Sequence, residues 1–187
     1  MQNSKKFFIV TFYKCFSFEQ IQLLENLLKR QFKKLKIVGT VILTPEGINS
    51  TIASQNLVSL KKGIALIEKY CGNLETKNSI SDKQPFKKLK IKSRQEIVPS
   101  GINLRIENHQ GKYVDPEDWH DFISHNDVQT IDVRNEYEIE VGTFKNSISP
   151  NTKNFREFNK YIIDNKKLLN RKKIAIFCTG GVRCEKA

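Results

Sequence analysis

Cysteine and histidine are scarce in this chain, and their spacing argues against two kinds of site. The 187 residues include four cysteines and three histidines, and no two cysteines form a C-x-x-C pair. A zinc site needs about four ligands at suitable spacing, so we expect no metal site. A disulfide framework is equally unfavoured in a chain with this much apolar sequence. No flavin, haem or iron ligand set is recognisable, and we expect Cys15 and Cys71 to be packing residues.

Long apolar runs are lacking as well. No stretch approaches the roughly 18–20 apolar residues that cross a bilayer, so we expect no membrane association. The first residues, Met1 to Lys6, lead directly into a strand-like run and lack the apolar core of a signal peptide. We therefore expect a cytoplasmic protein.

Acidic residues are too few to balance the basic ones. The chain has 32 Lys and Arg against 20 Asp and Glu, a net charge of +12. Such a charge favours nucleic acid as the partner, because neutralised phosphates release counterions. The alternative is a compositional bias toward Lys, Asn and Ile, which leaves many lysines as solvated surface. The sequence does not indicate an oligomeric state.

The first half of the chain, residues 1–97, predicts an α+β domain of the ferredoxin-like type. Apolar residues recur at helical spacing in two segments, and β-branched and aromatic runs mark four strands. Their order, βαββαβ, is the split βαβ arrangement. The predicted strands are Phe7–Tyr13, Ile37–Leu43, Ile48–Ala53 and Phe86–Ser93, and the predicted helices are Phe18–Phe32 and Leu57–Tyr70.

The pattern changes after a polar stretch, residues 98–111, which we interpret as a linker. Residues 112–187 alternate helices and strands, which predicts an α/β domain with a parallel sheet. Pro116 suits the first turn of a helix. The later predicted elements are the strand Val128–Val133, the helix Phe155–Leu169 and the strand Ile174–Phe177. Ligands of such sheets gather at the carboxyl ends of the strands.

The segment Cys-Thr-Gly-Gly-Val-Arg-Cys, residues 178–184, follows the last predicted strand directly. A turn with adjacent glycines can aim several main-chain N–H groups at one sulfur, and Arg183 adds a permanent positive charge. Both effects favour the thiolate, which is the reactive form. We therefore predict that Cys178 and Arg183 are the catalytic residues; a small buried cysteine is the alternative. The expected main-chain donors are Thr179, Gly180, Gly181 and Val182.

Other polar residues have two open interpretations. Cys184 either resolves an oxidised Cys178 as a disulfide or packs in a helix. Asp132, Arg134 and Glu138 either shape the pocket or cross-link loops, and we favour the structural role. We interpret the three histidines, His109, His120 and His125, as surface residues.

Basic residues on or beside the last strand of the first half are candidates for RNA contact. A solvated face is the alternative interpretation. The candidates are Lys87, Lys88, Lys90, Lys92 and Arg94, and Phe86 and Tyr13 are candidates for stacking on bases.

Two groups of motifs resemble known families. Asp132-Val133-Arg134, with Glu138 and Gly142-Thr143-Phe144, is similar to the Asp-Val-Arg…Glu…Gly-His motif of rhodanese domains, and residues 178–183 match the rhodanese active-site loop. With motifs of the first half, they resemble the bacterial tRNA uridine hydroxylase family over nearly the whole chain. Those motifs are Thr11–Lys14, Pro45–Asn49 and Lys90–Lys92.

The resemblance implies an acylphosphatase-like domain followed by a rhodanese-like domain that is incomplete at its C-terminus. It also implies an oxidoreductase that uses molecular oxygen to convert the wobble uridine 34 of tRNA to 5-hydroxyuridine. The implied partner is the tRNA anticodon loop, and the implied site is the reactive cysteine loop.

Two functions other than tRNA hydroxylation also fit the residues. One is a sulfurtransferase that carries sulfur as a persulfide, and another is a non-catalytic RNA-binding fragment. A cysteine phosphatase fits less well, because its loop has Cys-x5-Arg spacing and this loop has Cys-x4-Arg.

Overall fold

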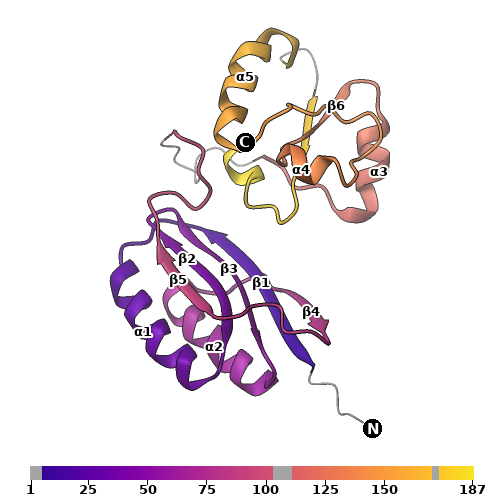
Figure 1. Ribbon diagram of the computed structural model, residues 1–187. Coiled ribbons are helices and arrows are strands. Elements are labelled where there is room, and N and C mark those ends of the chain that lie inside the picture. Colours follow the sequence, from indigo (N-terminus) through magenta and orange to yellow (C-terminus); the bar gives the residue numbers. More distant parts are fainter. Residues whose placement is uncertain (1–5, 103–110, 170–172) are drawn as a thin grey trace. The chain divides into compact units, whose positions relative to one another are not determined.

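The computed structural model describes residues 6–102, 111–169 and 173–187 (Figure 1). The chain divides into two compact units, a first unit of Met1–Ile97 and a second unit of Val98–Ala187. Most of the predicted linker, and His109 with it, lies outside the described residues.

The first unit consists of one five-stranded sheet and two helices. The strand order is β4-β1-β3-β2-β5. Neighbouring strands are antiparallel except β5, which runs parallel to β2. The elements are β1 (Phe7–Cys15), α1 (Ile21–Lys34), β2 (Val38–Thr44), β3 (Gly47–Ser54), α2 (Leu57–Cys71), β4 (Lys77–Ser81) and β5 (Leu89–Ser93).

The ferredoxin-like arrangement is present, but its last strand is not the one that we predicted. β4 pairs with β1 and completes the βαββαβ order, whereas Leu89–Ser93 is a fifth strand at the opposite edge. β4 has the sequence Lys-Asn-Ser-Ile-Ser, and its one large apolar residue, Ile80, is 63% exposed. An edge strand that buries so little has no apolar alternation by which sequence could reveal it.

The core of the first unit lies between the sheet and its helices. Both helices lie on the same side of the sheet in Figure 1, and alternate strand residues face them. The buried cluster includes Val10, Phe12, Val41, Ile52, Leu24, Leu28, Phe32, Leu60 and Ile67. The turn between β2 and β3 depends on Gly47, whose φ is +128° and whose added Cβ would lie 2.0 Å from the Lys14 carbonyl oxygen.

The second unit contains two parallel strands and three α-helices within the described residues. β6 (Val128–Asp132) pairs with β7 (Lys173–Phe177). The helices are α3 (Pro116–Ser124), α4 (Glu136–Ile139) and α5 (Arg156–Leu169), and a short 3-10 helix, η2 (Cys184–Lys186), follows the last strand. Ile131, Val133 and Phe158 are fully buried and form part of its core.

None of the helices in the described part of the chain is long and apolar enough to cross a membrane.

Candidate active site

The two parallel strands bring Asp132 and Cys178 to the same edge of the sheet. Asp132 is the last residue of β6 and pairs with Phe177, the last residue of β7. Cys178 therefore begins the loop at the carboxyl ends of the strands, where ligands of parallel sheets gather.

The loop turns back toward the Cys178 sulfur. The Gly181 N–H donates to Cys178 Sγ at 3.0 Å. Gly181 has φ +96°, a conformation open to glycine and strained for other residues. The glycine thus allows the chain to present a main-chain donor to the sulfur.

The surroundings of Cys178 lower its pKa from 9.0 to about 5. The largest cause is a hydrogen bond from the Cys184 thiol; burial opposes it, and main-chain amides of Arg183, Gly180 and Cys184 add to it. Donors that favour the charged form outweigh desolvation here. Cys178 is consequently a thiolate at neutral pH.

Cys184 is the protonated member of the pair. Its pKa is raised, first by the hydrogen bond to Cys178, then by burial and by the charge of the thiolate. The Cys184 N–H donates to the Gly181 carbonyl at 2.9 Å, which holds the loop closed. Our sequence interpretation did not include this role as a donor. The signal that was available is a second cysteine six residues after the first, beyond two glycines.

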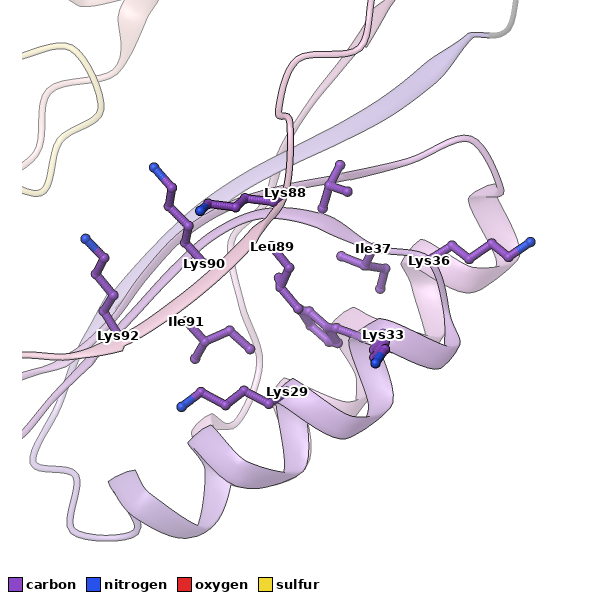
Figure 2. Close-up of a pocket in the computed structure, with 11 residues that line it drawn as sticks. Lys29, Lys33, Lys36, Ile37, Lys88, Leu89, Lys90, Ile91 and Lys92 are labelled. Carbon is purple, nitrogen blue, oxygen red and sulfur yellow. The ribbon is translucent and has the colours of Figure 1, made fainter.

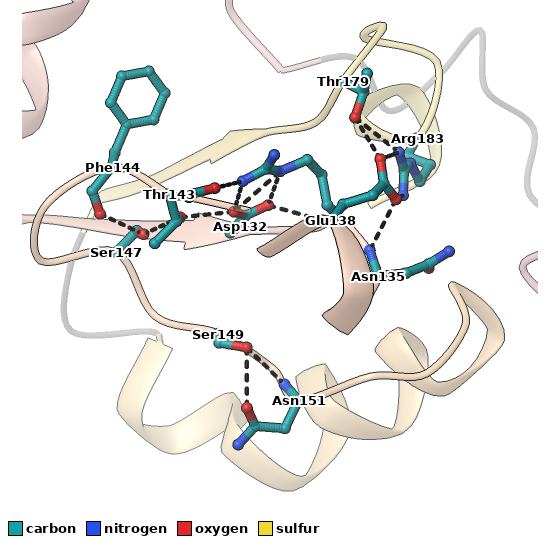
Figure 3. A network of polar contacts seen from close by, with 12 residues as sticks. Asp132, Asn135, Glu138, Thr143, Phe144, Ser147, Ser149, Asn151, Thr179 and Arg183 are labelled. Carbon is teal, nitrogen blue, oxygen red and sulfur yellow. Dashed lines mark hydrogen bonds and ion pairs between the residues drawn. The ribbon is translucent and has the colours of Figure 1, made fainter. Parts of the chain in front are cut away.

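Arg183 forms its closest contacts with Glu138 of α4 (Figure 3). Arg183 Nη1 lies 2.6 Å from Glu138 Oε2 and Nη2 lies 2.7 Å from Oε1. The Thr179 hydroxyl donates to the same carboxylate. These bonds, the one from Arg183 first, lower the pKa of Glu138 to about 2. The ion pair fixes the loop to α4, while the guanidinium charge also favours the Cys178 thiolate.

Asp132 and Arg134 form a second ion pair, and Arg134 is close enough to Glu138 and Arg183 to feel their charges. Arg134 donates from Nε and Nη2 to the Asp132 carboxylate at 2.9 and 2.6 Å, and from Nη2 to the Gly142 carbonyl at 2.6 Å. The Thr143 hydroxyl donates to Asp132 at 2.7 Å. Burial alone would raise the pKa of Asp132, but these bonds together lower it. Asp132 thereby connects the end of β6 to the loop around residue 143.

The basic residues predicted for RNA contact lie along or beside β5. Lys88, Lys90 and Lys92 are exposed and line a groove of about 630 Å³ between β5 and α1, together with Lys29, Lys33 and Lys36. Figure 2 shows Lys90 and Lys92 pointing away from α1, while Leu89 and Ile91 point toward it. Lys87 and Arg94 are exposed beside the ends of the strand. Phe86 and Tyr13 are half-buried.

Within the described ranges, no three or more His, Cys, Asp or Glu residues are grouped so that they could hold a metal ion. His120 and His125 are exposed. Cys71 is buried in the first unit, and burial raises the pKa of its thiol to about 11.

Comparison with known proteins gives matches to both parts of the chain. The UPF0176 acylphosphatase like domain matches residues 7–97. A tRNA uridine(34) hydroxylase from Picosynechococcus sp. is 44% identical over 98% of this chain, which spans 62% of that protein. The protein of the same name from Acinetobacter baylyi is 43% identical over 83% of this chain and is covered over 49% of its length. That from Rickettsia conorii is 41% identical over 92% of this chain and is covered over 72% of its length.

Among solved structures, an acylphosphatase from Coxiella burnetii is 8% identical and covers 49% of this chain, with a TM-score of 0.34. An acylphosphatase from Bacillus subtilis is 11% identical and covers 46%, with a TM-score of 0.32. Likenesses this weak add nothing to the fold that the strand order and the family match establish.

Proposed function

Because the chain belongs to the family of tRNA uridine(34) hydroxylases, we propose that it acts in the hydroxylation of uridine 34 of tRNA to 5-hydroxyuridine. The observation that carries the proposal is the high identity to these enzymes across both units of the chain. The chain spans less than two thirds of two of these relatives, so the activity belongs to a protein that includes these residues.

The second unit is, in this proposal, a rhodanese-like domain of which part is present. Support comes from the parallel pair β6 and β7 and from the cysteine loop at their carboxyl ends. The motif residues Asp132 and Arg134 tie a neighbouring loop to β6, and Glu138 holds Arg183. These contacts support a positioning role for the three residues, and we propose that Cys178 carries the chemistry.

Cys178 supplies a thiolate that is half-buried and ionised at neutral pH. Such a group serves as a nucleophile or carries an additional sulfur atom. The main-chain N–H groups of Gly180 and Gly181 donate to it, and we propose that Thr179 and Val182 serve as further residues of the loop. Molecular oxygen is the proposed co-substrate, by the nature of the hydroxylation.

The proposed partner is the anticodon loop of tRNA, which carries uridine 34. The exposed lysines of β5 support this partner, because lysines that contact phosphates release counterions. We also propose a cytoplasmic location, because tRNA is the proposed substrate.

The test is the nucleoside content of tRNA from a strain that lacks the gene. We expect 5-hydroxyuridine and its derivatives to disappear, to return with the wild-type gene and to stay absent with Cys178→Ser. Growth under 18-oxygen gas should label the new hydroxyl. Unchanged 5-hydroxyuridine in the deletion strain would overturn the proposal.

The curated relatives do not favour a sulfurtransferase or a non-catalytic RNA-binding fragment. The same Cys178→Ser protein separates these from the hydroxylase. A sulfurtransferase would form thiocyanate from thiosulfate and cyanide and lose that activity on substitution. A binding module would keep tRNA affinity and confer no modification in either form.

A further inference from the structure

One face of the sheet in the first unit has neither of that unit's two described helices against it (Figure 1). Both α1 and α2 pack on the other face, where the buried cluster lies. Since successive strand residues point to opposite faces, the residues that alternate with the cluster form the helix-free face.

The strand register places a row of five side chains straight across this face. Thr11 pairs with Lys77 on one side and Thr51 on the other. Thr51 in turn pairs with Thr40, and Thr40 with Lys90. The row therefore reads lysine, threonine, threonine, threonine, lysine. At a strand spacing of about 4.8 Å, it spans about 19 Å.

Two of the three hydroxyls in this row lie close together, and the threonines are partly accessible. Thr11 Oγ1 and Thr51 Oγ1 are 3.0 Å apart, and all three threonines are half-buried. Tyr13 lies on the same face in the next row, which crosses Asn49 and Ile42 and ends at Lys92. The face thus offers hydroxyl groups at its centre and an aromatic side chain beside them.

The charge of this face has one sign. The five strands of the first unit, as described, contain no aspartate or glutamate. Lys77, Lys90 and Lys92 are exposed at the two edges of the sheet. Lysine is common on edge strands and threonine pairs are common between strands, but neither tendency requires that acidic residues be absent from every strand.

We propose that this face binds a single-stranded stretch of RNA. The edge lysines contact phosphates, and the threonine hydroxyls contact ribose 2′-hydroxyls, which are both donor and acceptor and which DNA lacks. The inference rests on the proposed function and adds the surface on which the tRNA loop lies. A sheet face that carries aromatic residues is a known platform for unstacked bases.

The first experiment measures the salt dependence of binding to an RNA anticodon stem-loop by the chain. Lys77→Ala/Lys90→Ala removes the two ends of the row. The slope of log K against log salt should fall by about 1.4, since each single-strand phosphate contact contributes about 0.7. The control, Lys61→Ala/Lys62→Ala, removes the same charge from exposed positions of α2 and should leave the slope unchanged.

The second experiment tests the hydroxyl row. Thr40→Val/Thr51→Val keeps the shape of both side chains and removes their hydroxyls. We expect the affinity for the RNA loop to fall severalfold, while the affinity for a DNA loop of the same sequence stays constant. Thr40→Ser/Thr51→Ser should restore the preference for RNA, because serine keeps the hydroxyl.

The outcomes separate this proposal from the proposed function. Suppose that the chain binds the RNA loop but the lysine variant shows the same salt dependence as the wild type. The sheet face is then not the binding surface. The same conclusion follows if the valine variant loses affinity for the RNA and DNA loops equally. The function then stands with another surface, such as the α1 side of the groove, where Lys29, Lys33 and Lys36 lie. If the wild-type chain does not bind the RNA loop, both proposals fail.

Discussion

The two units use charge in opposite ways. In the first unit, exposed lysines on β4 and β5 make none of the ion pairs found in the described part of the chain. In the second unit, Arg134 and Arg183 are largely buried, and each donates hydrogen bonds from two nitrogens to one carboxylate. Exposed charge gives a field that salt screens, whereas buried pairs fix geometry. In the proposed function, the first unit attracts a polyanion and the second positions a sulfur.

The largest contrast is between Cys178 of the second unit and Cys71 of the first. With pKa values of about 5 and about 11, Cys178 should have about a 10⁴-fold larger thiolate fraction than Cys71 at pH 7. Iodoacetamide labelling followed by peptide mass spectrometry should therefore show Cys178 modified first. Its rate should rise through pH 5 and level off by about pH 7 rather than climb to pH 9.

Substitution of Cys184 sharpens that result. Cys184→Ala removes the largest stabilising donor, so the pKa of Cys178 should rise and the labelling curve should move to higher pH. Cys184→Ser keeps a hydroxyl donor, so its labelling curve should lie between those of the wild type and Cys184→Ala. A curve that is the same in all three proteins would contradict the assigned role of Cys184.

The next largest effect is expected at Asp132, whose side chain is 1% exposed. Asp132→Ala leaves Arg134 without its carboxylate, and breaking such a buried pair costs about 3–5 kcal/mol. Hydrogen exchange should accelerate at the amides of β6 and β7 and stay constant in β1 and β3. Equal acceleration in both units would show that they do not unfold independently.

Glu138 gives a smaller, pH-dependent effect. Its pKa falls from 4.5 to about 2 on folding, so the ionised carboxylate stabilises the second unit fully above about pH 4.5. That stabilisation, on the order of 3 kcal/mol, is lost as pH falls through about 2. The difference in unfolding free energy between wild type and Glu138→Gln should therefore shrink from pH 5 to pH 2. A constant difference would exclude ionisation as the cause.

The smallest effect is expected at the exposed lysines. Lys90→Ala/Lys92→Ala should change the unfolding free energy by no more than about 0.5 kcal/mol, as surface substitutions do. Thermal melting at low and high salt measures this. A loss of unfolding free energy as large as that of Asp132→Ala would show that the exposed lysines, like the buried ion pairs, stabilise the fold.

Sequence alone was enough to place the elements that bury an apolar face. The helices α1, α2 and α5 and the strands β1, β2, β3, β6 and β7 lie within a few residues of their predicted positions. β4 could not be predicted, since its partner strand determines it and its own side chains are exposed. The pairing of Glu138 with Arg183 joins residues 45 positions apart, and no local pattern encodes such a contact. Sequence indicated that Cys178 is ionised, but not that Cys184 supplies the main donor.

The added strand β5 also has a consequence for solubility. β2, with the sequence Val-Gly-Thr-Val-Ile-Leu-Thr, would otherwise end the sheet and offer its main-chain groups to any other extended chain. β5 covers that apolar strand with one whose exposed side chains are lysines. Loss of residues 86–94 should therefore leave a protein that folds its core but aggregates through β2.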